Sequence, residues 1–218
     1  MSGALKEVRN RIKSVQSTQQ ITKAMKMVSA AKLRRAQDAI TQMRPYAQKL
    51  QEMLSNIVSN SDGDVNIALA AERPVENVMI IVVTSDRGLC GGYNSNLIKL
   101  AKQVISDKYS QQAAKGKVQI LPIGKKGYES FTKAGGKVVN QYWDIFTGLS
   151  FDKVQAAAKH AMDAFANKEV DAVELIYSEF KNAATQRFVA EQFLPVQKTG
   201  KTEGQKMPIL FLSRAKMY

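Results

Sequence analysis

A glycine-rich turn is the stretch of this sequence whose residue types come closest to those of a ligand-binding or reactive site. The turn is Ser85-Asp-Arg-Gly-Leu-Cys-Gly-Gly92, and it directly follows a run of β-branched residues. In α/β proteins, such a turn between a strand and a helix commonly binds a phosphate group. Its glycines do not have the G-x-G-x-x-G spacing, and no Lys-Ser/Thr pair follows. We therefore interpret the turn as a tight strand-to-helix connection whose surface contacts a partner, and we expect no cofactor.

The same turn carries the only cysteine of the chain, Cys90. A catalytic cysteine needs a general base, and the only histidine, His160, lies 70 residues further along with no motif around it. No group of Cys, His and carboxylate residues has the spacing of a metal site. Lys125 and Lys126 could contact a phosphate, but a solvated turn is the more common outcome. The sequence thus predicts a chain with no catalytic residues and no metal.

The elements that position this turn follow from the pattern after Pro74, where apolar segments of strand and helix character alternate. We predict strands at 78–84, 118–123, 137–141, 172–177 and 186–193, the last one antiparallel, and helices at 94–107, 126–133 and 151–166. This order is typical of a small Rossmann-like α/β domain with crossover helices. We expect a loop at 197–206 and a short strand or helix start at 209–212.

A long helix is predicted in front of this domain, over 4–60, because the stretch has no glycine and a single proline, Pro45. At full length it would measure roughly 85 Å, so its own domain cannot bury it. Apolar residues occupy the a and d positions of a heptad pattern at both ends, as in a coiled coil. In the middle, Gln19, Thr22, Lys26 and Ser29 interrupt this seam. The seam requires a facing helix, which the rest of this sequence does not supply.

Charge divides the long helix into two parts. Residues 1–35 contain nine Lys or Arg residues and one acidic residue, a net charge of +8, whereas residues 36–60 are neutral. A basic block of this kind attracts nucleic acid, anionic lipid or an acidic protein surface. Met25 and Met27 lie within the block and offer a flexible contact surface. The apolar runs of the chain are too short to span a membrane.

The resulting organisation is an α/β fold class, with a long N-terminal coiled-coil-type helix and a small Rossmann-like α/β domain. We expect a shaft helix at 1–60, a linker at 61–76 and the α/β domain at 77–212. Residues 213–218 are interpreted as the start of a further helix.

Two motifs then carry a family resemblance. The run Ile12-Lys-Ser-Val-Gln-Ser-Thr-Gln-Gln-Ile-Thr-Lys-Ala-Met-Lys-Met-Val28, followed by Ala30-Ala-Lys32 and Arg44-Pro-Tyr46, resembles the N-terminal helix of the gamma subunit of F-type ATP synthases. The stretch from Thr84 to Gly92 is similar to the loop after the first strand in the same family. The likeness extends from residue 3 to about 212, and it is to the bacterial type of this gamma subunit.

The resemblance implies a non-catalytic rotary shaft, which couples ion-driven rotation of a membrane ring to conformational changes of the catalytic beta subunits. The implied partners are the alpha, beta and epsilon subunits and the membrane c-ring, with one copy of this chain per complex. The implied location is peripheral, at the cytoplasmic face of the bacterial inner membrane, without direct membrane insertion or nucleic acid. The partner-contact residues that we carry over as a hypothesis are Arg9, Lys23, Met25, Lys26, Met27, Arg87, Gly92, Lys99 and Lys102.

Family members also end in a second long helix, and we expect this sequence to lack it, because it stops at Tyr218. That helix would be the natural partner of the seam. Two other functions stay open from the residues alone. One is a nucleic-acid-binding protein that uses the basic block, although no aromatic residue lies among its first 35 residues to stack on bases. The other is a small nucleotide-binding α/β enzyme.

Overall fold

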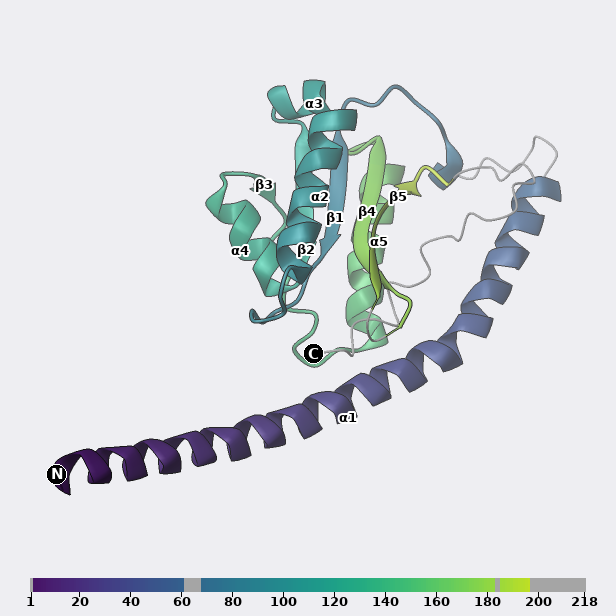
Figure 1. Cartoon of the computed structure of the whole chain (residues 1–218). Coiled ribbons are helices and arrows are strands. Elements are labelled where there is room, and N and C mark those ends of the chain that lie inside the picture. Colours follow the sequence, from purple (N-terminus) through teal and green to yellow (C-terminus); the bar gives the residue numbers. More distant parts are fainter. Residues whose placement is uncertain (1, 61–67, 183–184, 197–218) are drawn as a thin grey trace.

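A long helix and an α/β domain make up the computed structural model, which describes residues 2–60, 68–182 and 185–196 (Figure 1). The helices and strands, with η1 a short 3-10 helix, are in chain order α1 (Ser2–Asn60), η1 (Ala68–Ala70), β1 (Val78–Val83), α2 (Tyr93–Lys108), α3 (Ser110–Ala114), β2 (Val118–Ile123), α4 (Lys125–Lys133), β3 (Lys137–Val138), α5 (Phe151–Ala166), β4 (Ala172–Phe180) and β5 (Gln186–Leu194).

The sheet has five strands in the order β3-β2-β1-β4-β5. Strands β1, β2, β3 and β4 are parallel, and β5 pairs antiparallel with β4. Helix α5 packs on one face of the sheet, and α2 and α4 pack on the other. This arrangement confirms the predicted Rossmann-like α/β fold with crossover helices.

Strand β1 lies at the centre of the sheet, and this position explains why its sequence is continuously apolar. Val78, Ile80 and Val82 face α2 and α4. Met79 and Ile81 point to the opposite face, toward α5. Because successive side chains of a strand alternate between the two faces, a strand that is covered on both needs an apolar residue at every position.

Helix α1 is a single helix of 59 residues with Pro45 inside it. Figure 1 shows that it changes direction in its second half, which contains Pro45. A proline inside a helix removes one backbone hydrogen bond, so a bend in this half is expected. The predicted long shaft helix is therefore present.

Burial along α1 corrects one expectation about the seam. From Gly3 to Lys32 every residue is exposed, so the seam at this end has no facing element among the described residues. Between Leu33 and Ala47, however, residues at heptad spacing are covered: Ala36 and Ile40 are buried, and Leu33 is half-buried. The expectation that the second half of the seam also lacks cover in this chain is therefore wrong for Leu33 and Ile40, whereas Leu50 is exposed as expected.

Most predicted elements have the expected position, and the differences are local. Strand β3 has two residues instead of five, because the chain turns away from β2 after Val139, whose N–H donates to the Ile120 carbonyl. Helix α3 and η1 were not predicted. The predicted features at 197–206, 209–212 and 213–218 lie outside the described residues, as do residues 61–67 of the predicted linker.

The segment that leads into β1 is held by a partly buried ion pair. The Arg73 guanidinium donates from Nε to Asp171 Oδ1 at 2.5 Å, and from one NH2 group to the carbonyl oxygens of Phe165, at 2.7 Å, and Val170. It also lies 4.3 Å from the centre of the Phe165 ring. The other oxygen of Asp171 accepts the N–H groups of Glu76 and Asn77. These contacts fix the entry to the sheet against the end of α5.

Candidate functional site

The glycine-rich turn after β1 is braced by its own polar groups. Asn94, in the first turn of α2, accepts the Ser85 N–H at 2.9 Å through its side-chain oxygen. Its amide nitrogen donates to the Ser85 hydroxyl at 2.9 Å and to the Arg87 carbonyl at 3.3 Å. The Ser85 hydroxyl donates to the same Arg87 carbonyl at 2.6 Å. The turn thus has a defined conformation that does not depend on a ligand.

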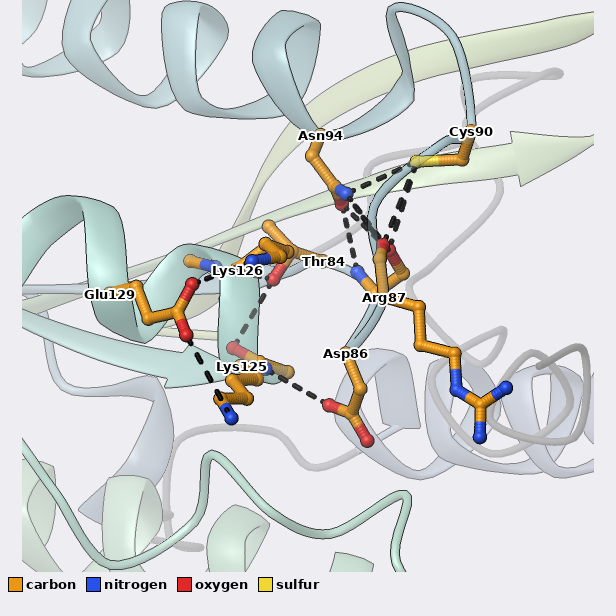
Figure 2. A network of polar contacts seen from close by, with 11 residues as sticks. Thr84, Asp86, Arg87, Cys90, Asn94, Lys125, Lys126 and Glu129 are labelled. Atoms are coloured by element: carbon orange, nitrogen blue, oxygen red, sulfur yellow. Dashed lines mark hydrogen bonds and ion pairs between the residues drawn. The ribbon is translucent and has the colours of Figure 1, made fainter.

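The turn also closes the N-terminus of α4, where the fold would otherwise offer free N–H groups. Figure 2 shows Asp86 reaching the start of α4, where its carboxylate accepts the Lys125 N–H at 2.9 Å. The next two N–H groups donate to the Ser85 carbonyl at 3.1 Å and to the Thr84 hydroxyl at 2.8 Å. A phosphate would need these same donors. Asp86 therefore takes the place that an anion could occupy at the start of α4.

Glycine is required where the two connections meet. Gly124 has φ +103°, and a Cβ at this position would collide with the Thr84 carbonyl oxygen. This close approach lets the end of β1 and the start of α4 touch through the backbone. Lys126 donates to Glu129 at 2.7 Å, and this hydrogen bond lowers the pKa of the Glu129 carboxyl. Lys126 thus has an acidic partner within its own helix.

Cys90 and His160 do not form a catalytic pair. Cys90 Sγ lies 3.1 Å from the Asn94 amide nitrogen, on the α2 side of the sheet. His160 is on α5, which covers the opposite face, and its ring lies 5.4 Å from that of Tyr142. Within residues 2–60, 68–182 and 185–196, no group of His, Cys, Asp or Glu residues could hold a metal ion.

The candidate contact residues of the α/β domain share one exposed region. Arg87 and Gly92 lie in the turn, and Lys99 and Lys102 lie on the outer face of α2, away from its buried residues. Positions 92, 99 and 102 follow helical spacing, so they form one stripe. Leu89 projects at the tip of the turn, fully exposed and with φ 61°. Sequence reasoning did not single out Leu89, although its place between two glycines was a usable signal.

The candidate residues of α1 are all exposed, but they do not lie on one face. Residues Arg9, Lys23, Lys26 and Met27 fall within about 100° of one another around the helix, whereas Met25 lies on the other side. The structure thus groups Lys23, Lys26 and Met27 as neighbours at i, i+3 and i+4. Met25 is 66% exposed and belongs with Ile21 and Val28 instead. The two groups therefore point in different directions from the helix axis.

One contact that sequence reasoning missed joins α1 to the domain. A guanidinium NH2 group of Arg44 donates to the Phe180 carbonyl at 3.0 Å, across 136 residues of sequence. Arg44 belongs to the Arg-Pro-Tyr stretch at the second end of the α1 motif, but no local pattern indicates its partner.

Among the helices that the structure describes, none is long and apolar enough to cross a membrane.

Comparison with known proteins identifies the family. A family model described as ATP synthase matches residues 4–216. The ATP synthase gamma chain of Cytophaga hutchinsonii is 51% identical over 194 residues, which cover 89% of this chain and 66% of that one. The gamma chain of Chlorobaculum tepidum is 48% identical over 196 residues, covering 90% and 67%. The chain thus spans about two thirds of the length of the curated relatives it matches.

Solved structures agree in fold. The central stalk and c-ring structure of the Tetrahymena thermophila mitochondrial ATP synthase contains a chain with a TM-score of 0.57 and 24% identity, with 90% of this chain and 88% of that one covered. A chain of the Euglena gracilis mitochondrial ATP synthase has a TM-score of 0.54 and 18% identity, with 88% and 57% covered. Neither a nucleic-acid-binding protein nor a nucleotide-dependent enzyme is supported by these matches. A family model over nearly the whole chain and relatives near half identity together show that this chain belongs to the ATP synthase gamma-chain family.

Proposed function

We propose that this chain is the central rotary shaft of an F-type ATP synthase and performs no chemistry itself. Rotation of an ion-driven membrane ring would turn the α/β domain, and α1 would turn with it inside a ring of alpha and beta subunits. The curved helix would then present different contacts to each catalytic beta subunit in turn. Each contact would bias that subunit toward one of its conformations.

The observation that carries this proposal is the free end of α1. From Gly3 to Lys32 the helix is exposed on every side, and this stretch contains most of the basic block. A helix exposed all around its circumference contributes nothing to a core in this chain, so its apolar and basic residues are available to other subunits.

Weak electrostatic contacts suit a shaft that moves past several copies of one partner. Lys23 and Lys26 are exposed, and ion pairs between exposed groups contribute only about 0–1 kcal/mol each. Contacts of this strength hold a position briefly without locking it. We propose Arg9, Lys23, Lys26 and Met27 as one contact group of the shaft and Met25 as part of a second. Arg87, Gly92, Lys99 and Lys102 would form a further contact at the domain.

The partners follow from the family and stand as proposals. They are the alpha, beta and epsilon subunits and the c-ring, with one copy of this chain in each complex. We place the chain peripherally, at the cytoplasmic face of a bacterial inner membrane. The domain organisation proposed is a shaft at 1–60, a linker at 61–76 and a domain from 77 to about 212.

Reconstitution tests the proposal. The chain would be combined with bacterial alpha and beta subunits, together with a polypeptide equivalent to the remaining third of its relatives. We expect a complex of three alpha, three beta and one gamma chain with ATPase activity. Reversal of charge at Lys23 and Lys26 should change that activity by about two- to tenfold, as expected for the loss of weak ion pairs. The same reversal at Lys133 and Lys137, which are exposed on the α/β domain, is the matched control.

Two results would count against the proposal. One is the failure of the unmodified chain to assemble under these conditions. The other is a change in ATPase activity of equal size in the Lys133/Lys137 control, since the effect would then come from net charge rather than from the position on the shaft.

A further inference from the structure

We infer that Arg44 fastens the shaft to the α/β domain, so that torque passes between them at the end of β4. This inference rests on the proposed rotary function and adds to it the place where the domain drives the helix. Nothing in the chemistry of the sequence motif indicates such a role. It follows from where the structure places the two ends of one strand.

The first step is the change in burial along α1. Every residue from Gly3 to Lys32 is exposed, whereas Ala36 is fully buried and Ile40 is 2% exposed. Half-buried residues at Leu33, Met43 and Ala47 complete one face at heptad spacing. The helix therefore consists of a free segment up to residue 32 and a segment from residue 33 to 47 with one covered face, which we call the seated segment.

The second step is the contact within the seated segment. Arg44 donates to the main-chain carbonyl of Phe180, the last residue of β4, and Phe180 is itself buried. Strands β4 and β5 pair from Val173 to Phe180, so this carbonyl belongs to a well-paired hairpin. Since Arg44 bonds to the backbone, it holds a position that does not change with side-chain rotamers. A charged donor makes this bond stronger than one between neutral groups.

The third step is the position of a second attachment at the other end of the same strand. The segment that follows α1 in the chain is held by Arg73 and Asp171, and Asp171 directly precedes β4. The Val196 N–H also donates to the Leu69 carbonyl at 2.9 Å, within the same segment. The two attachments are therefore separated by the length of β4, roughly 30 Å.

Two separated attachments are what torque transmission requires. A helix that is held at one point can swivel about that point when the domain turns. Arg44 lies on α1 itself, whereas Arg73 holds the chain beyond the end of the helix, so Arg44 is the attachment through which the sheet acts directly on the helix. Figure 1 shows α1 passing close to the lower end of β4, while the segment after α1 returns toward the upper end of the sheet. Arg44 is thus a positioning residue for the shaft.

The test uses Arg44→Met, with Arg44→Lys as the conservative variant and Gln48→Met, one turn along α1 and exposed, as the control. Spin labels on cysteines introduced at Gln16 and Gln103, in a Cys90→Ser background, report the distance between the free segment and the domain. We expect one narrow distance distribution for the parent and for Gln48→Met. Loss of the charged hydrogen bond should raise the unseated fraction about tenfold in Arg44→Met, with Arg44→Lys in between.

The same variants in a complete ATP synthase, with its membrane ring reconstituted in sealed lipid vesicles, give a second readout, the number of ions pumped per ATP hydrolysed. Arg44→Met should lower this ratio while the complex still assembles, and Arg44→Lys should restore part of it. A parent-like distance distribution in Arg44→Met would overturn the inference, as would an unchanged pumping ratio. If Arg44→Met unfolds the domain, Arg44→Lys decides by the same criteria. Failure of the unmodified chain to assemble would instead contradict the rotary function, and the distance measurement on the isolated chain would still test the attachment.

Discussion

At the scale of single residues, Asp171 joins three other residues at the entry to the sheet. It is 8% exposed and accepts hydrogen bonds from Arg73 and from the N–H groups of Glu76 and Asn77. Burial disfavours its charged form, but the two backbone N–H groups and the Arg73 side chain outweigh this effect. The net result is a pKa of the Asp171 carboxyl below its usual range. Asp171 is therefore a structural anchor rather than a proton donor.

Replacement of Asp171 by Asn should destabilise the domain by about 3 kcal/mol at pH 7, because Arg73 would keep a charge without its buried partner. Urea unfolding measures this change in the free energy of unfolding. Asp163→Asn is the matched control, since its ion pair with Lys159 is exposed and should contribute less than about 1 kcal/mol. Equal losses in both variants would show that burial around Asp171 is unimportant.

The pH dependence of this effect has a definite sign. Because the pKa of Asp171 is lower in the folded state, its stabilisation is fully present above the unfolded value, near 3.8, and is lost as pH falls through the folded value. The difference in unfolding free energy between the parent and Asp171→Asn should be constant from about pH 7 to about pH 5 and decrease below about pH 4. A difference that grows on acidification would contradict the assignment.

Residue roles were the least predictable part of this molecule. The absence of a phosphate-binding signature in the turn after β1 could be read from glycine spacing. The sequence could not show that Asp86 accepts an N–H group of α4, because Asp86 and Lys125 are far apart in sequence and meet only when the sheet forms. Arg44 and its Phe180 carbonyl have the same property. The roles of the exposed candidates, such as Lys23 and Lys99, stay predictions because their partners belong to other chains.

At the scale of elements, prediction succeeded where one physical pattern was strong. The apolar run of β1 and the spacing of α5 gave correct positions, and α5 also has a Ser150 N-cap, which accepts the Lys153 N–H. Helix α3 was missed because its Ser-Gln-Gln-Ala-Ala sequence has no apolar period, and the Gln112 contact with the Val75 carbonyl helps to hold it. Strand β3 was predicted too long because its end depends on where the next loop leaves the sheet.

Helix α1 should differ in stability along its length, and hydrogen exchange can measure this. Most helix stability in proteins comes from packing rather than from intrinsic propensity. Backbone amides at 5–30 should therefore exchange at least about tenfold faster than those at 36–47, where Ala36 and Ile40 are buried. The buried face of α5 serves as an internal reference for strong protection. Uniform protection along α1 would show that its free segment is covered in the isolated chain.

At the scale of the whole molecule, the free segment leaves an apolar seam exposed. Leu5, Val8, Ile12 and Val15 are 52–62% exposed and share the a and d positions of the heptad pattern. Other apolar residues of the segment, such as Ile21, are equally exposed but lie off this seam. The surface thus contains two apolar groups of similar size, of which only one has the geometry of a coiled coil.

Coiled-coil geometry predicts which of the two groups drives self-association of the isolated chain. Replacement of Ile12 and Val15 by Gln should weaken association by about tenfold, because a facing helix would no longer bury apolar side chains at these positions. Replacement of Ile21 and Val28 by Gln removes apolar surface of similar exposure off the seam, and it should have a much smaller effect. Sedimentation velocity over a concentration series measures both. If the two double variants weaken association equally, nonspecific apolar contacts drive the association, and α1 does not present a specific seam to a partner helix.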